Sequence, residues 1–240
     1  MNHRQLAVVL LACALAACGT PLENGSSTFM EQVRLGDPQA QQTFNDNREL
    51  FESAEALPIW VDALANADSP QVKRWAATLI GNIGDPSSLP ALAAAMSDSR
   101  DVRDAAIDAI GAFDAGDAAG AYASVLQDGD RDAQAPALAA LARMGADAGP
   151  AVKDIATAAS TSETLIASTA VNTLADIGTD GAAESLADLA TNTALDMDRR
   201  RASIQALQRI DSEAAAAALE QVSTTLAEEE GADELRAVLS

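Results

Sequence analysis

The sequence is short of the side chains that carry most enzyme chemistry. Its 240 residues include one histidine, His3, and two cysteines, Cys13 and Cys18. All three lie within the first eighteen residues. Metal sites built from histidine and cysteine, and nucleophilic catalysis by Ser-His-Asp or Cys-His arrangements, are therefore excluded from residues 19–240.

Carboxylates are abundant, and one run of them begins like a calcium-binding loop. Residues 128–132 (Asp-Gly-Asp-Arg-Asp) have the required alternation, but Ala133 replaces the glycine and Ala139 the glutamate that such a loop needs. We interpret the run as a turn whose aspartates cap the next helix. A carboxylate pair for glycoside hydrolysis is an alternative, but the acidic residues follow the turns between helices, which favours capping. We therefore expect no catalytic site, no metal site and no cofactor, and a protein that is not an enzyme.

Lysine and aromatic residues are also scarce. The chain has two lysines, 3% aromatic residues and a formal charge of −21. A field of this sign repels nucleic-acid phosphates, so we expect no nucleic-acid partner. The 48% apolar content is mostly alanine with leucine, isoleucine and valine, and almost no segment alternates with the period of a strand. The chain is therefore predicted to be all-α.

The amino terminus has the features of a secretion signal. A basic start precedes a twelve-residue apolar stretch from Leu6 to Ala17, which is too short to span a bilayer as a permanent helix. The segment Leu15-Ala16-Ala17-Cys18 resembles the lipobox of bacterial lipoproteins. The resemblance implies removal of a signal peptide, residues 1–17, and attachment of a lipid to Cys18. It also implies acylation of the new amino terminus, for example by palmitate. An ordinary cleaved signal with an incidental cysteine is the alternative.

The same resemblance implies a location in the bacterial cell envelope, with the protein facing the periplasm. Position 19 is glycine rather than aspartate, which implies the outer rather than the inner membrane. Residues 18–27 are predicted to form the lipidated cysteine and a flexible tether, because the segment Gly19–Ser27 is polar and shows no periodicity.

A short block recurs down the chain and defines its organisation. The inner apolar anchors of successive blocks are spaced by 30, 31, 33 and 33 residues. Self-similarity at this period is typical of a solenoid, in which each unit buries its apolar face against its neighbours. The blocks are Val72–Gly84, Val102–Asp114, Gln134–Gly145, Thr169–Gly178 and Arg199–Asp211, and their anchors are Ile80, Ile110, Leu141, Leu174 and Leu207.

Each unit is predicted to contain two helices. In the first unit, Ser69 provides an amino-terminal cap, Pro70 occupies the first helical position, and Gly84 ends the helix. A second helix follows after a turn, and the later units keep this order. Upstream, Leu50–Ala56 and Leu57–Asn66 are interpreted as a degenerate first pair, which brings the number of helix pairs to about six.

These blocks resemble HEAT repeats of the short bacterial kind that occurs in phycobilisome lyases. The residues that carry the resemblance are Asp98–Ala106 (DSRDVRDAA) and Val72–Gly81 (VKRWAATLIG). The resemblance implies a right-handed α-solenoid of antiparallel helix pairs over residues 57–225, preceded by the signal peptide. Its second helices would line the concave face. The absence of histidine after residue 18 removes the His-Glu iron ligands of hydroxylases built from similar repeats.

The later blocks depart from this pattern at one position. The basic residue that follows the valine position is kept as Lys73, Arg103 and Arg200, but it becomes Gln134 and Ala167 in the other two blocks. We therefore do not expect a continuous ladder of ion pairs between the repeats.

The segments outside the repeats are predicted to be caps. Residues 28–56 would form an amino-terminal helical cap, and residues 226–240 a carboxyl-terminal capping helix. Solenoids need a polar outer face on their last repeat.

Three large aromatic side chains stand out in the repeats. Trp75 is expected in the core because it falls on the inward side of its helix. Trp60 and Tyr122 fall on second helices, and either could be an exposed anchor for a partner, since aromatics dominate interface hot spots. Packing in the repeat core is the alternative for both.

A solenoid without catalytic side chains is best interpreted as a binding surface. We predict a lipid-anchored periplasmic scaffold or adaptor for another envelope protein, with a basic segment as the expected ligand because the chain is acidic. Two alternatives are an accessory or maturation factor for an envelope enzyme and a purely structural spacer. The first predicts a pocket with convergent polar groups, and the second predicts self-association through an apolar patch.

Overall fold

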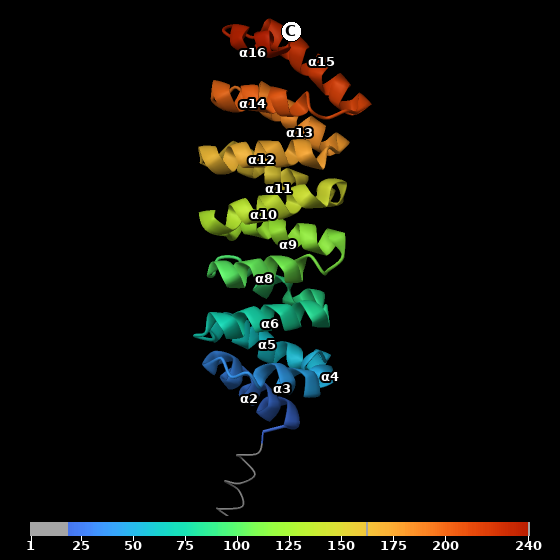
Figure 1. The fold of residues 1–240 in the computed structure, drawn as a ribbon. Helices are drawn as coiled ribbons and strands as arrows, with labels where there is room; N and C mark the ends of the chain where they lie inside the picture. The colour runs from blue at the N-terminus through green and yellow to red at the C-terminus, as the bar shows by residue number, and fades with distance from the viewer. Residues whose placement is uncertain (1–18, 162, 240) are drawn as a thin grey trace, which may run out of the picture.

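The computed structural model describes residues 19–161 and 163–239, which form a stack of helices (Figure 1). These residues contain helices and turns but no strand, and the prediction of an all-α solenoid is confirmed. The signal segment 1–17 and Cys18 lie outside the described residues. None of the described helices is long and apolar enough to cross a bilayer.

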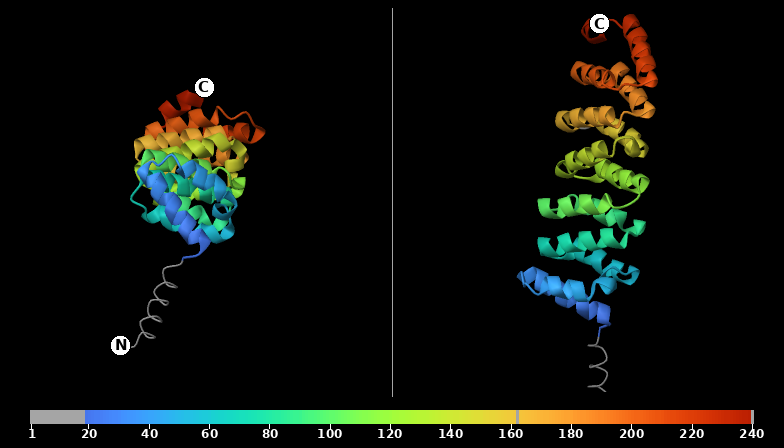
Figure 2. Two further views of the ribbon diagram at one scale, coloured as in Figure 1. Left: turned by 60° about the horizontal axis from the view of Figure 1, so that its bottom comes forward. Right: turned by 45° about the vertical axis from the view of Figure 1, so that its right-hand side comes forward.

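The helices form two layers that run the length of the stack (Figures 1 and 2). In each layer, every helix contacts the next helix of that layer. The first layer consists of α2 (Pro21–Leu35), α6 (Pro70–Ile83), α8 (Arg100–Ile110), α10 (Arg131–Met144), α12 (Thr164–Ile177), α14 (Met197–Leu207) and α16 (Asp233–Leu239). The second layer consists of α5 (Leu57–Asn66), α7 (Leu89–Ala95), α9 (Ala115–Asp128), α11 (Val152–Thr161), α13 (Asp180–Thr191) and α15 (Glu213–Glu228). The remaining elements are α3 (Ala40–Asp46), α4 (Arg48–Phe51) and the 3₁₀ turns Ala54–Ala56, Pro86–Ser88 and Gly145–Ala151.

Local sequence signals set the helix ends in the first regular unit. The Ser69 hydroxyl accepts a hydrogen bond from the Val72 backbone N–H, and Pro70 is the first residue of α6. Gly84 ends the helix in the left-handed conformation, with φ of 69°, which a glycine adopts without steric cost. A side chain at Gly81 would place its Cβ 3.0 Å from the Cα of Ala109, so this glycine permits the close approach of α6 and α8.

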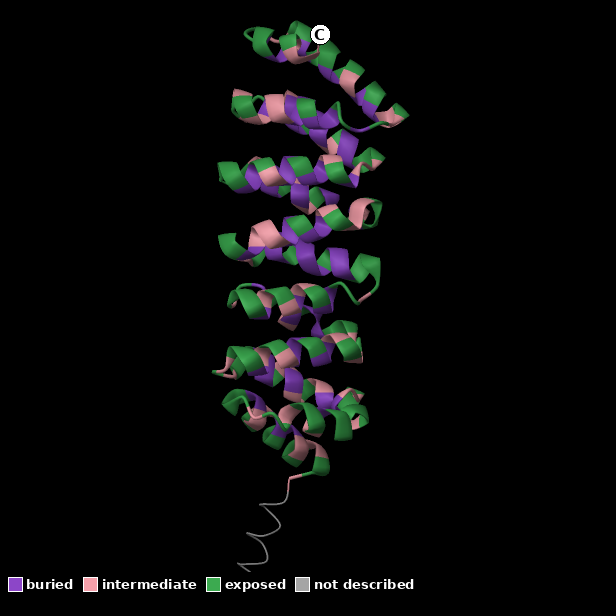
Figure 3. Ribbon diagram, viewed as in Figure 1, coloured by how far each residue is buried: buried purple, intermediate pink, exposed green. Residues whose placement is uncertain are grey.

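The core lies between the two layers, as the purple segments of Figure 3 show. All five repeat anchors are completely buried, and the period read from the sequence is confirmed. These anchors are Ile80, Ile110, Leu141, Leu174 and Leu207.

The amino-terminal end differs from the prediction. A capping box starts α2 at Pro21: the Thr20 hydroxyl accepts from the Glu23 N–H at 3.2 Å, and the Glu23 carboxylate accepts from the Thr20 N–H at 2.7 Å. Residues 21–27 are therefore helical, and their assignment to a flexible tether is wrong. The polar composition hid this helix, whose first fully buried apolar side chain is Phe29.

The first helix pair also has different members. Leu50–Ala56 does not form a helix, because α4 ends at Phe51 and a 3₁₀ turn follows. Instead, α2 packs against α6 and takes the first-layer position, with α5 as its second-layer partner. The described residues thus hold six helix pairs, and α16 adds a further first-layer helix.

The carboxyl-terminal end differs as well. The predicted single capping helix over 226–240 is wrong, because α15 continues to Glu228 and the chain then turns. Gly231 provides the reversal with φ of 81°, and α16 follows. Buried Leu235 anchors α16 to the stack.

Candidate functional site

The two aromatic side chains that were candidates for binding a partner are both buried. Trp60 is 1% exposed, and its indole N–H donates to the Phe51 carbonyl oxygen at 2.7 Å. Tyr122 is 2% exposed, and its hydroxyl donates to the Ile107 carbonyl oxygen at 2.8 Å. The expectation of exposed anchors is therefore wrong. Both rings fill the space between the layers, where their polar atoms find backbone partners.

The five aromatic residues from Phe29 to Trp75 form one cluster. Trp75 is half-buried and packs its ring 5.3 Å from Phe29 and 5.2 Å from Phe44, so its predicted core position is confirmed. Trp60 lies at right angles to both Phe29 and Phe51. The cluster joins α2 to the first repeats and leaves no aromatic ring of these residues as a surface anchor.

Tyr122 also lacks the properties of an acid–base group. Burial raises the pKa of its hydroxyl to about 12, an effect that the positive charge of Arg143 partly offsets. The group is therefore neutral at physiological pH and acts as a hydrogen-bond donor within the core.

The acidic run at residues 128–132 is a helix cap. The Asp130 carboxylate accepts from the Ala133 N–H at 2.9 Å and starts α10, as predicted. Among the described residues, no three histidine, cysteine, aspartate or glutamate side chains are placed to hold a metal ion.

The basic residues of the repeats are used inside the fold. The Arg103 Nε donates to the Met96 carbonyl oxygen at 2.7 Å and so satisfies the end of the preceding second-layer helix. Gln134 makes the same kind of bond to Leu126 at 3.2 Å, so an uncharged donor can take this place, whereas Ala167 at the equivalent position has no side-chain donor. Sequence comparison of the blocks found this position but did not reveal its role.

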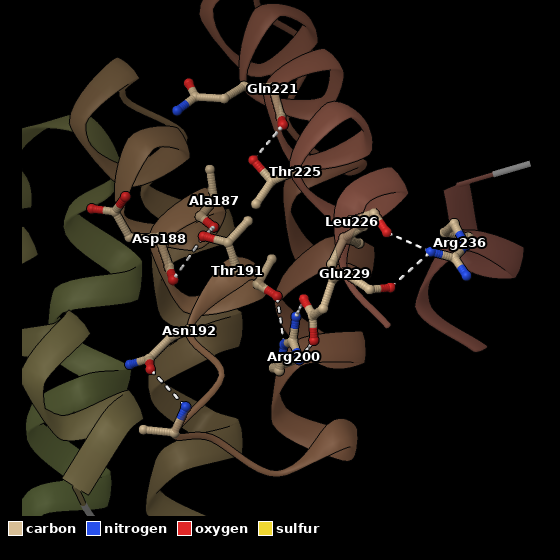
Figure 4. Close-up of polar contacts among 12 residues, drawn as sticks. Ala187, Asp188, Thr191, Asn192, Arg200, Gln221, Thr225, Leu226, Glu229 and Arg236 are labelled. Carbon is tan, nitrogen blue, oxygen red and sulfur yellow. Dashed lines mark hydrogen bonds and ion pairs between the residues drawn. The ribbon is translucent and has the colours of Figure 1, made fainter. Parts of the chain in front are cut away.

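An ion pair between buried Arg200 and half-buried Glu229 reinforces the same arrangement near the carboxyl end (Figure 4). Arg200 is 3% exposed, donates to the Ala190 carbonyl oxygen at 2.8 Å and forms two hydrogen bonds with the Glu229 carboxylate at 2.7 and 2.5 Å. These bonds lower the pKa of Glu229. The pair ties α13, α14 and the end of α15 together.

Several other cations cross from one repeat to the next. Lys73 contacts Asp98 at 2.7 Å, which lowers the pKa of that carboxyl group. Arg209 contacts Asp176 at 2.6 Å. Such pairs join some neighbouring repeats and not others, in keeping with the expectation of a discontinuous ladder.

This use of cations leaves the two layers with different charge. On the second-layer helices α5 to α15, Lys153 is the one cation. The carboxylates of these helices are exposed or half-exposed, and none has a lysine or arginine of the described residues within 4 Å. They are Asp62, Asp117, Asp128, Asp154, Asp180, Glu184, Asp188, Glu213, Glu220 and Glu228. We call this surface the acidic face.

A groove of about 720 Å³ opens on the acidic face between α7 and α9. One wall carries Leu89, Pro90, Ala93 and Ala94 of α7. The other wall carries small residues of α9, together with the carboxylates Asp117 and Asp128. The groove combines an apolar floor with acidic ends, and it is the part of the acidic face that we consider as a binding site.

Comparison with known proteins supports the fold. Residues 57–124 match the family model described as HEAT repeats, and no curated protein matches the chain. The match shows HEAT-like repeats in this part of the chain, and the helical architecture agrees with the predicted solenoid. The match covers α5 to α8 and the first ten residues of α9, so it includes the α7 side of the groove and Asp117 but ends before Asp128.

Several solved structures are similar to the chain. Human deoxyhypusine hydroxylase in complex with glycerol is 20% identical, with 91% of this chain and 94% of that chain covered and a TM-score of 0.41. The archaeal HEAT-like repeats protein from Thermococcus onnurineus is 15% identical, with 89% and 96% covered and a TM-score of 0.42. The complex of CpcE and CpcF of phycocyanin lyase from Nostoc is 16% identical, with 89% and 93% covered and a TM-score of 0.37.

Proposed function

We propose that this chain is a lipid-anchored scaffold or adaptor that binds another protein in the bacterial cell envelope. The observation that carries the proposal is the acidic face. Its carboxylates have no cationic partner within the described residues, whereas most cations of the first layer are used in bonds within the fold. Unpaired surface charge of one sign accelerates association with a partner of the opposite sign and selects for it.

The anchor is proposed from the segment Leu15–Cys18 and from the start of α2. Only Gly19 and Thr20 stand between Cys18 and the first helical residue, Pro21. Two or three extended residues span about 10 Å, so a lipid on Cys18 would hold the amino-terminal end of the stack close to the membrane. The opposite end would point away from it (Figure 1). The protein would face the periplasm, on the outer membrane in view of Gly19.

We further propose that the protein has no catalytic activity of its own. Beyond Cys18 the sequence holds neither histidine nor cysteine. The tyrosine of the solenoid is buried, neutral and bonded to the backbone. Of the carboxylates considered for a metal loop, Asp130 caps the start of α10. Binding is therefore the function that the surface supports best.

Two experiments test the proposal. Full-length protein and a Cys18→Ser variant are compared for membrane association, which the substitution should abolish; unchanged partition into membranes would contradict the anchor. Separately, crosslinking in native membranes should capture a stoichiometric protein partner. Capture should fall when carboxylates of the acidic face are changed to the corresponding amides. Turnover of a small molecule by the pure protein would contradict the scaffold role.

A further inference from the structure

The groove between α7 and α9 has a regular acidic edge. Asp117 and Asp128 are eleven residues apart on α9, and both line the groove. Eleven residues make almost exactly three helical turns, so the two carboxylates point to nearly the same side of α9, about 16 Å apart along its axis. Ser124 lines the groove between them.

The floor of the groove is made of residues that allow a close approach. A Cβ atom added at Gly116 or Gly120 would meet nothing within 4 Å, so the space above both residues is open. Ala93 of α7 and Ala121 of α9 line the groove with short side chains. α7 has seven residues and α9 has fourteen, so the shorter helix does not cover the full length of the longer one.

These dimensions fit an α-helix laid lengthwise in the groove. Helices pack with axes about 8–10 Å apart, and small side chains at the contact favour the closer distances. A bound helix would place its apolar face on the floor and expose its polar face to water, which is the usual mode of helix-in-groove recognition. Two cations eleven residues apart on such a helix would match the spacing of Asp117 and Asp128.

We propose that this groove binds an amphipathic helix of a partner protein. The helix would carry small apolar residues on the groove floor and lysine or arginine side chains eleven residues apart that contact Asp117 and Asp128. Charge complementarity selects this occupant, because neither carboxylate has a cationic partner among the described residues and the whole acidic face repels an anionic helix. The inference rests on the proposed function of protein binding and names the site and the chemistry of the partner.

The test uses a synthetic probe and the full-length chain. The probe is an amphipathic 18-residue helical peptide with an alanine-rich face and two lysines eleven residues apart. Its counterpart carries glutamates at those two positions. Fluorescence anisotropy in low salt should show binding of the lysine peptide and none of the glutamate peptide. The affinity should fall as the salt concentration rises, because salt screens exposed charges.

Two kinds of variant locate the binding. An added Cβ at Gly120 meets nothing within 4 Å, so Gly120→Leu should place its side chain in the groove and weaken binding at least tenfold, with the helical circular dichroism unchanged. Its matched control is Gly181→Leu on α13, where an added Cβ also meets nothing within 4 Å. The double variant Asp117→Asn/Asp128→Asn should weaken binding about tenfold, since it removes two surface pairs.

The control for the charge change is the double variant Asp101→Asn/Asp132→Asn. It alters the net charge equally, but it lies on the first-layer helices α8 and α10. If this control weakens peptide binding equally, the effect comes from the net charge alone and the proposed site is wrong. Failure of the lysine peptide to bind at millimolar concentration would overturn it too. Stronger binding of a proline-containing peptide with two lysines five residues apart would also overturn the site, because such a peptide reaches both carboxylates only when it is extended.

Failure of the groove and failure of the proposed function give different results. If the partner captured in native membranes is retained by Gly120→Leu, the protein is a scaffold that uses another surface. If the unaltered chain captures no protein, the scaffold function itself fails.

Discussion

The side chain of Arg103 donates a hydrogen bond to the carbonyl oxygen of Met96 at 2.7 Å, at the end of the second-layer helix that precedes it. The same relationship recurs along the stack, where the donor is the fourth residue of a first-layer helix. Its other examples are Gln134 with Leu126, Arg200 with Ala190 and Arg236 with Leu226. Because these donors stand on the first layer, the repeats place their cations there and leave the second layer acidic.

We predict that Arg103→Ala lowers the free energy of unfolding by about 2 kcal/mol, because the carbonyl oxygens of Met96 and Asp98 lose charged donors. Arg100→Ala on the same helix is the control. Its side chain is 89% exposed and lies 3.8 Å from Asp104, so the loss should stay below about 0.5 kcal/mol. Urea unfolding measures both. Equal losses would contradict the capping role.

The pair Arg200–Glu229 predicts a pH dependence. The pKa of Glu229 is lower in the folded protein than in the unfolded chain because Arg200 bonds its carboxylate. A lowered folded-state pKa adds stability above the unfolded pKa, and this stability is lost as the pH falls through the folded pKa. Thermal unfolding between pH 7 and pH 3 should therefore show a smaller loss for Glu229→Gln than for the wild type.

At neutral pH, Glu229→Gln should lower the free energy of unfolding by about 2 kcal/mol, because it weakens two charge-assisted hydrogen bonds to a buried guanidinium. Glu230→Gln is the matched control, since Glu230 is exposed and forms no ion pair with the described residues. If both variants follow the same pH profile, the ion pair does not set the acid sensitivity.

The buried aromatic residues predict a loss of stability without a loss of binding. Tyr122→Phe removes the bond to Ile107 and should cost about 1 kcal/mol. Trp60→Phe leaves the Phe51 carbonyl unpaired and reduces buried volume, which should cost about 2–3 kcal/mol. Chemical denaturation gives the stability, and crosslinking at a temperature where both variants are folded gives the binding. If either variant captures less partner at that temperature, the residue contacts the partner after all.

The capping box predicts order at the amino-terminal end. Thr20→Ala removes the acceptor of the Glu23 N–H and should destabilise α2 by about 1 kcal/mol. Hydrogen exchange of the amides in α2 should become faster. Thr28→Ala is the control, because Thr28 lies within the same helix and alanine is the better helix former there. Fast exchange of residues 21–27 already in the wild type would support a flexible tether.

Much of the fold could be predicted from the sequence because the repeats are regular. Ile80 and the equivalent anchors recur at a fixed period, and Ser69, Pro70 and Gly84 mark the helix ends by local chemistry. At the chain ends this logic fails. The segment 21–27 is polar and contains glycine, so only its short-range capping box indicates a helix.

The candidate binding site could be predicted less well from the sequence, because its residues depend on which side of each second-layer helix faces the solvent. Trp60 and Tyr122 stand on second-layer helices, yet their rings point between the layers. The groove arises from small residues on two helices some thirty residues apart in sequence, such as Ala93 and Ala121. Composition reveals that alanine is abundant but not which alanines leave space open. The net charge indicated a basic partner, and the distribution of that charge needed the structure.

The most direct test of the acidic face as the binding surface is a charge-reversal cycle. Asp117→Lys/Asp128→Lys in the full-length chain is combined with the peptide that carries glutamates in place of the two lysines. Each reversal alone should weaken binding at least tenfold, because like charges then face each other across the groove. The two reversals together should restore the affinity to within about threefold of the original pair. Losses that simply add, with no recovery in the doubly reversed pair, would contradict the account.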